Sequence, residues 1–219
     1  VSDPRWHDCV NLMAAGIRMA DAVHTVSPSY SREILEASAP PGFYGGEGLE
    51  TVLQHAASEG RLAGILNGLD VSGDRPPEAG FADFLRVGRS SVNRWAGAHP
   101  TVASAHFLAH NRLTDAALSP EPPQMLLACV SRLVEQKMLL LCTAGSDGRT
   151  GLDRILEGIG DRRQVALLGS GDPVWERRLL EIAARHENFV FLNGYSDACA
   201  DALYACGDLF LMPSSYEPC

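Results

Sequence analysis

Short apolar runs alternate with amphipathic segments throughout the second half of the chain. Apolar residues spaced three and four apart predict helices, and uninterrupted apolar runs of about four to eight residues predict buried strands. Strands are expected at residues 125–131, 164–168, 189–192 and 209–212, and helices at 151–159, 174–186 and 198–205. Strands and helices that alternate in this way are typical of βαβ units, so the pattern predicts a doubly wound parallel sheet.

The first half shows the same periodicities less regularly. A helix is expected at 9–21, a strand at 22–26, a helix capped by Ser27-Pro28 with its body at 31–35, and a strand at 62–66. Residues 39–48, rich in glycine and proline, indicate a loop, and residues 71–80 indicate a linker. From 82 to 118 the pattern is mostly helical with a break at Pro100. Residues 71–80 are therefore the best candidate for a linker between two parts of the chain.

Polar turns follow each predicted strand of the second half. They lie at residues 132–137, 169–173, 194–195 and 213–219. Ligands of an open parallel sheet bind outside the carboxyl ends of its strands. We therefore expect these four turns to line one crevice.

Two cations lie in the first of these turns, Arg132 and Lys137. Lys137 is the only lysine of the chain, and all other side chains that are always positively charged at neutral pH are arginines. Lysine offers a compact ammonium and arginine a planar fork, and both suit a phosphate or diphosphate group. Solvated charges at an ordinary strand end are an equally good interpretation of this turn taken alone.

The second and third turns offer backbone and aromatic contacts. Gly169 and Gly171 allow a close approach to an anion at the start of the next helix, although Asp172 is equally well explained as the N-cap of that helix. Tyr195, with Gly194 beside it, suits stacking on a nucleobase as well as packing on the sheet edge. The second turn, at residues 169–173, lacks the GxGxxG and P-loop patterns, and this absence disfavours a dinucleotide-dependent oxidoreductase.

Composition excludes several classes of function. The formal net charge is −9 and no basic stripe is present, so nucleic acid is not an expected partner. The six cysteines form no CxxC pair and no metal-ligand spacing, so we expect no metal and a reducing, cytoplasmic location. His106 and His110, four residues apart on a predicted helix, are interpreted as a surface or core pair. No apolar run of 18 residues or more, as a membrane span requires, occurs in the sequence.

Six sequence words, in order, resemble those of bacterial glycogen (starch) synthases. This family consists of retaining glucosyltransferases that use ADP-glucose and have the GT-B fold. The matching words lie at residues 22–30, 64–70, 130–137, 167–173, 194–195 and 207–219. The resemblance implies an α/β GT-B-type fold with a Rossmann-like, doubly wound C-terminal domain and the last part of a second α/β domain. It also implies transfer of glucose from ADP-glucose to the non-reducing end of an α-1,4-glucan such as glycogen.

The resemblance also implies roles for individual residues. Arg132 and Lys137 would bind the donor diphosphate and stabilise the departing ADP, with no metal or other cofactor. Glu217 would complete the catalytic set at the glucosyl group. The substrate-binding residues implied are Asn67, Gly169, Gly171, Gly194, Tyr195 and Cys219.

The implied domains are residues 1–70, the end of the acceptor-side domain; 71–124, a linker and helical connection; and 125–219, the first part of the nucleotide-sugar domain. We expect this piece alone to bind donor weakly and to transfer no glucose. Met138 after Lys137 and Ser215 before Tyr216 depart from the family pattern and indicate a divergent branch. Two alternatives stay open: a sucrose- or trehalose-type GT-B transferase, and a non-catalytic glucan-binding relative.

Overall fold

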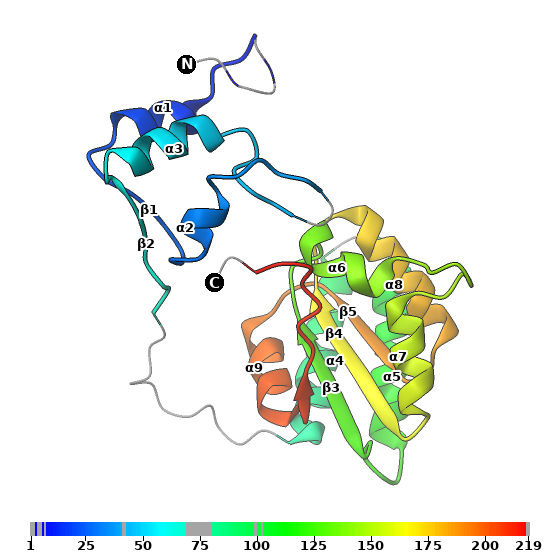
Figure 1. Ribbon diagram of the computed structural model, residues 1–219. Coiled ribbons are helices and arrows are strands. Elements are labelled where there is room, and N and C mark those ends of the chain that lie inside the picture. Colours follow the sequence, from blue (N-terminus) through cyan, green and yellow to red (C-terminus); the bar gives the residue numbers. More distant parts are fainter. Residues whose placement is uncertain are drawn as a thin grey trace. The chain divides into compact units, whose positions relative to one another are not determined.

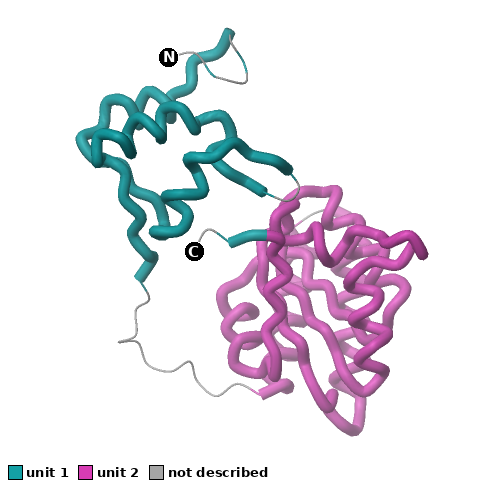
Figure 2. The backbone as a smooth tube through the Cα atoms, in the orientation of Figure 1, with its two compact units in different colours: residues 1–73, 216–219 teal, residues 74–215 magenta. Residues whose placement is uncertain are grey.

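The computed structural model describes residues 3, 6, 8–40, 43–68, 80–98, 100–101 and 103–217. The chain divides into two compact units, one formed by residues 1–73 with 216–219 and the other by residues 74–215 (Figure 2). The linker expected at residues 71–80 lies, apart from Gly80, outside the described residues.

The first unit is built from short elements around one parallel strand pair. β1 pairs with β2 from Val23 opposite Leu62 to Thr25 opposite Gly64. The apolar residues Ala14, Val52, Leu53 and Ala56 are buried on its helices. The elements are α1 (Leu12–Met19), β1 (Val23–Thr25), α2 (Tyr30–Glu33), α3 (Glu50–Ser58) and β2 (Leu62–Gly64).

Two helices of this unit differ from the sequence-based expectation. α2 begins at Tyr30 because the Ser27 hydroxyl accepts a hydrogen bond from the Tyr30 N–H at 3.0 Å, which leaves Pro28 in the preceding turn. The pattern predicted no helix over α3, which has no side-chain N-cap and follows a run of glycines. The N–H of Gly48 is instead satisfied by the Glu50 carboxylate at 2.8 Å.

The second unit contains a four-stranded sheet in which every pair of neighbours is parallel (Figure 1). The strand order is β5-β4-β3-β6. In register, Met125 lies opposite Arg163, Val165 opposite Phe189, and Leu127 opposite Leu209. The strands are β3 (Met125–Val130), β4 (Arg163–Gly169), β5 (Phe189–Asn193) and β6 (Leu209–Phe210).

Helices cover both faces of this sheet. Successive side chains of a strand point to opposite faces, so Leu127 and Leu167 join one apolar cluster, and Leu126 and Leu168 join the other. The first cluster is closed by α6 (Glu135–Cys142), α7 (Gly151–Ile159) and α8 (Pro173–Arg185). The second is closed mainly by α4 (Phe81–Gly97), α5 (Ser104–Leu118) and α9 (Asp197–Cys206). The predicted doubly wound parallel sheet is confirmed.

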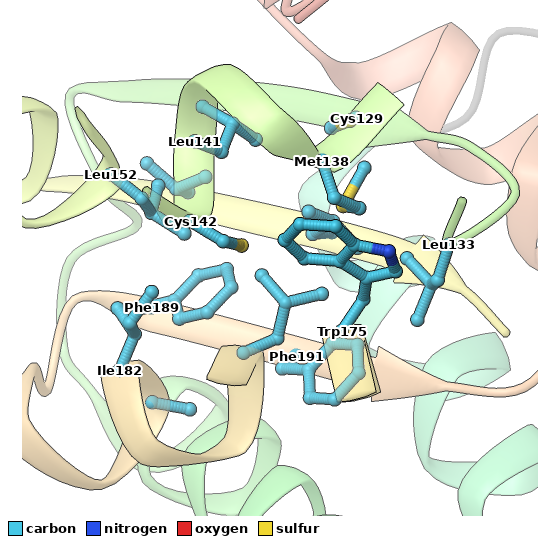
Figure 3. Close-up of a cluster of buried hydrophobic side chains, with 14 of the residues drawn as sticks. Cys129, Leu133, Met138, Leu141, Cys142, Leu152, Trp175, Ile182, Phe189 and Phe191 are labelled. Carbon is cyan, nitrogen blue, oxygen red and sulfur yellow. The ribbon is translucent and has the colours of Figure 1, made fainter. Parts of the chain in front are cut away.

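The first cluster includes residues of the strands and of the segments that directly follow them. Trp175, Met138 and Leu133 pack together there with Cys129 of β3 (Figure 3). Met138 and Leu133 are fully buried. Full burial of a side chain of this size stabilises a fold by about 1.5–3 kcal/mol. Burial of Leu133 therefore anchors the first turn to the core of the unit.

A buried carboxylate ties α7 to the end of α8. Asp153 is only 5% exposed, and it accepts hydrogen bonds from the Thr150 N–H and hydroxyl at 2.9 and 2.7 Å. Arg185 and His186 donate to it at 2.9 and 2.8 Å. Burial alone would raise the pKa of Asp153, but these hydrogen bonds outweigh it and hold that pKa well below its usual range.

Candidate functional site

A hollow of about 260 Å³ lies at the carboxyl ends of β3, β4 and β5. Three of the four predicted turns contribute to it, and the described residues of the fourth, 213–217, are not among its lining residues. Arg132, Gly169 and Tyr195, which the sequence singled out, line it directly. The remaining lining residues are Val130, Ser131 and Ser170, whose apolar or hydroxyl side chains carried no distinctive signal in the sequence.

Main-chain hydrogen bonds join these three turns to one another. The N–H of Leu133 donates to the Ser170 carbonyl at 3.0 Å, and the N–H of Asp172 donates to the Leu133 carbonyl at 2.9 Å. The N–H of Gly194 then donates to the Gly169 carbonyl at 3.1 Å. The β3–β4 pairing therefore continues past the strand ends and holds the rim of the hollow in one piece.

The glycines of the second turn are required by this close approach. A Cβ on Gly169 would overlap the Ser131 carbonyl oxygen, and one on Gly171 would come within 2.5 Å of the Leu133 carbonyl oxygen. Both would press on the turn that carries Arg132. The glycines thus have a structural reason here, in addition to any contact with a ligand.

We expect Gly171→Ala to displace the Arg132 turn and to lower the free energy of unfolding by about 1–3 kcal/mol, the usual cost of overpacking. Urea unfolding followed by circular dichroism measures this change. Gly158→Ala is the matched control, because a Cβ on Gly158 would have no atom within 4 Å. Equal stability of the two variants would contradict the assigned packing.

Lys137 lies in a helix rather than in the polar turn expected from the sequence. It is in the first turn of α6, where its N–H donates to the Val134 carbonyl at 3.0 Å. Burial raises the pKa of the Cys129 thiol to about 12, and the positive charge of Lys137 acts in the opposite direction. The ammonium is therefore close enough to Cys129 of β3 for its charge to act on the thiol, but Lys137 is not among the residues that line the hollow.

The start of α8 is occupied by the chain's own carboxylates. The side chain of Asp172 accepts from the Val174 N–H at 2.8 Å, which confirms its role as N-cap. Glu176 accepts from the Gly171 N–H at 3.0 Å. The N–H groups of Gly171 and Val174, which were expected to favour an anion, are thus already hydrogen-bonded. The positive charge that lines the hollow comes from Arg132.

Tyr195 lies on the rim with its side chain 61% exposed. Its hydroxyl donates to the Asp197 carboxylate at 2.8 Å. This hydrogen bond and the negative charge of Asp197 raise the pKa of the Tyr195 hydroxyl, which favours the neutral phenol. The ring is held at its polar end and presents an open aromatic surface.

The fourth turn is anchored beside α6. The N–H and the hydroxyl of Ser215 both reach the Gln136 carbonyl, at 2.8 and 3.1 Å. β6 itself spans only Leu209–Phe210, shorter than the strand expected at 209–212. The turn therefore leaves the sheet next to the helix that carries Lys137.

Of the other predicted residues, Gly171, Gly194 and Lys137 belong to the same unit as the hollow but are not among the residues that line it. Asn67 and Glu217 are exposed residues of the first unit. In that unit Tyr216, next to Glu217, stacks on Tyr44 with ring centroids 4.4 Å apart. Cys219 lies outside the described residues.

A larger hollow, of about 690 Å³, lies at the opposite edge of the sheet, among the turns that precede β3, β4 and β5. Two of the arginines that line it already bind acidic side chains, Arg162 with Glu121 at 2.6 Å and Arg185 with Asp153 at 2.9 Å. It also lies away from the carboxyl ends where ligands of parallel sheets bind. The smaller hollow is therefore the better candidate site.

No group of three or more His, Cys, Asp or Glu side chains that could hold a metal ion occurs within the described part of the chain. In the same residues no helix is long and apolar enough to cross a membrane.

The known proteins similar to this chain are glycogen and starch synthases. The family profile described as starch synthase catalytic domain matches residues 1–55. Glycogen synthases of Edwardsiella ictaluri and Paracidovorax citrulli are 37% and 36% identical to the chain over 98% and 96% of its length. The chain is homologous to the glycogen and starch synthases.

A solved structure extends the similarity to three dimensions. The catalytic domain of starch synthase IV from Arabidopsis thaliana, bound to ADP and acarbose, matches 99% of this glycogen synthase homologue with a TM-score of 0.66 and 28% identity. The α/β fold class of GT-B type is thereby confirmed. The homologue spans 40% and 36% of the two glycogen synthases and 39% of the Arabidopsis chain.

Proposed function

We propose that this chain forms part of an enzyme that transfers glucose from ADP-glucose to the non-reducing end of an α-1,4-glucan, with retention of the anomeric configuration. The observation that carries the proposal is the hollow itself, where a cationic turn, a glycine turn and an exposed tyrosine converge on one sheet edge. Proteins named glycogen synthase and a starch synthase structure containing ADP are the similar proteins that support it.

The chemistry assigned to the hollow is electrostatic. When the bond between the anomeric carbon and the diphosphate breaks, ADP leaves with the bonding electrons and gains negative charge. Arg132 and Lys137 would stabilise that charge without a metal, which is the preorganised stabilisation that group transfer needs. The acceptor hydroxyl forms the new bond and its proton passes to the departing diphosphate.

We assign the remaining sites by position. Gly194 and Tyr195 would border the adenosine, Gly169 and Gly171 the phosphates, and Glu217 and Cys219 the glucosyl group. Asn67 would face the donor from the first unit. Residues 1–70 would belong to the acceptor-side domain and 125–219 to the nucleotide-sugar domain. Because α4 and α5 lie in the same compact unit as the sheet, we extend the second domain back to about residue 80.

We also propose a cytoplasmic location. Five cysteines are free among the described residues, and Cys129, Cys142 and Cys199 are buried. Buried thiols of this kind are typical of proteins kept in a reducing compartment.

Incorporation of labelled glucose into glycogen by the intact protein tests the reaction. We expect incorporation from ADP-glucose and much less from UDP-glucose. Transfer to fructose or glucose 6-phosphate instead of glycogen would favour the sucrose- or trehalose-type alternative. Absence of ADP-glucose binding by the intact protein would favour the non-catalytic alternative and overturn the proposal.

ADP is expected to stabilise the intact protein against unfolding. A ligand at 100 times its dissociation constant adds about 2.7 kcal/mol to the free energy of unfolding of a protein that binds it only when folded. Thermal unfolding followed by fluorescence, with and without ADP, measures the shift. Arg132→Ala should reduce the shift, and an unchanged shift would exclude Arg132 from the ADP site.

A further inference from the structure

The turn that carries Tyr195 rests on two side chains that lie far from it in the sequence. Trp95 belongs to α4 and His106 to α5, both of which cover the second face of the sheet. They contact the turn at Asn193 and Gly194, the two residues that precede Tyr195. Neither carries a motif that would connect it with the nucleotide.

His106 fixes the last residue of β5. Its side chain is buried, and Nε2 lies 2.9 Å from the Asn193 carbonyl oxygen. A carbonyl oxygen only accepts hydrogen bonds, so Nε2 carries the proton and donates. Nδ1 is also buried and has no hydrogen-bond partner within the described structure. Among the described residues, the His106 ring is therefore hydrogen-bonded only to the main chain of the turn, at the Asn193 carbonyl.

Trp95 fixes the next residue. A Cβ built on Gly194 would come within 2.6 Å of the indole ring atoms Cδ2 and Cε2. The indole therefore occupies the position of a Gly194 side chain and lies against its backbone. The Trp95 and His106 rings also pack on each other, with centroids 6.0 Å apart.

Hydrogen bonds to neighbouring segments also hold the turn. The Gly194 N–H reaches the Gly169 carbonyl at 3.1 Å, and the Tyr195 hydroxyl reaches Asp197 at 2.8 Å. The first bond links the turn to the glycine turn of the hollow, and the second holds only the tip of the tyrosine. Trp95 and His106 contact the turn and are not among the residues that line the hollow.

We propose that Trp95 and His106 are positioning residues for the nucleotide of the donor, because together they set where Tyr195 stands on the rim of the hollow. This inference rests on the proposed function, in which Tyr195 borders the adenosine. Neither residue touches the ligand. They act through the backbone of Asn193 and Gly194.

The first test compares His106→Leu with His106→Gln in the intact protein. The glutamine amide nitrogen reaches about as far as Nε2 and can donate the same hydrogen bond, whereas leucine cannot. We expect His106→Leu to weaken ADP binding at least about fivefold, measured by titration calorimetry, and His106→Gln to restore most of it. The KM for ADP-glucose should rise more than kcat falls, as expected when ground-state binding is lost.

Leu113→Ala is the matched control for general damage to the helix. Leu113 lies two turns further along α5, is fully buried, and belongs to the apolar cluster on the second face of the sheet. It should lower the unfolding temperature and leave the affinity for ADP unchanged. If Leu113→Ala weakens ADP binding as much as His106→Leu does, the effect is structural and the inference fails.

A second test uses the contact between Trp95 and Gly194. Gly194→Ala should weaken ADP binding because the new methyl group collides with the indole, and Trp95→Leu should weaken it because the support is lost. The double variant should bind ADP no worse than Gly194→Ala alone, since the collision is then removed. Effects that multiply in the double variant would show that the contact does not place the turn.

The outcomes distinguish failure of this inference from failure of the proposed function. ADP binding by the unmodified protein that is insensitive to both His106→Leu and Trp95→Leu overturns the inference and leaves the proposed function in place. Absence of ADP binding by the unmodified protein overturns both.

Discussion

Replacing Lys137 by alanine in the intact protein should slow glucosyl transfer by at least about tenfold, because a charge-assisted hydrogen bond is worth about 1.5–3 kcal/mol. The loss should appear in kcat as well as in kcat/KM, since the charge on the departing ADP is greatest in the transition state. Steady-state incorporation of glucose into glycogen measures it. The fold should survive, because only the ammonium and its chain are removed from the first turn of α6.

Arg177→Ala is the control for a general change of charge near the site. Arg177 is an exposed residue of α8 to which the proposed function assigns no contact with the donor, so its loss should leave transfer unchanged. Lys137→Arg keeps the charge but replaces the compact ammonium by a planar fork, and we expect intermediate activity. Full activity of Lys137→Ala would remove the cationic stabilisation from the proposed function.

Replacing Asp153 by asparagine should lower the free energy of unfolding by about 3 kcal/mol at pH 7, since hydrogen bonds to a charged group contribute about 1.5–3 kcal/mol. Asp153 accepts from Thr150, Arg185 and His186. Asparagine would turn one acceptor oxygen into a donor facing those donors. Urea unfolding of the two proteins measures the difference, and Asp115→Asn, at an exposed position of α5, should change stability little.

The effect of Asp153 should depend on pH in one direction. Its pKa is lower in the folded protein than in the unfolded chain, where it is about 3.9. The stabilisation is therefore fully present above the unfolded pKa and is lost as the pH falls through the folded value. The difference between wild type and Asp153→Asn should be constant from pH 7 to about 5 and should shrink below about pH 4. A difference that grows on acidification would contradict the assigned charge state.

The second unit could be predicted closely because its signals are local. Strands buried on both faces read as continuous apolar runs, and those at 125–131 and 189–192 match β3 and β5 within one residue. The helix expected at 151–159 is α7, with Thr150 and Asp153 forming its capping box. The convergence of Arg132, Gly169 and Tyr195 followed from one general rule, that parallel strands end at a common edge.

The features that were not predicted either have weak local signals or depend on contacts between distant parts of the chain. α6 was missed because Leu139 and Leu140, which follow Met138, give an apolar run without a clear helical period, and Val134 provides no side-chain cap. Met138, a departure from the family pattern, is fully buried in the first cluster. The support of Gly194 by Trp95 spans about a hundred positions of sequence, and no local pattern records it.

The hydrogen bonds that join the turns of the hollow limit how its chemistry can be altered. Gly169 and Gly171 admit no side chain, and the main chain around Leu133 is committed to both neighbouring turns. Within the hollow, the proposed contacts with a donor can therefore be altered through side chains that project from a fixed scaffold, such as those of Ser131, Ser170 and Tyr195. Laboratory evolution towards a different sugar nucleotide should accumulate substitutions at those three positions and leave the glycines untouched.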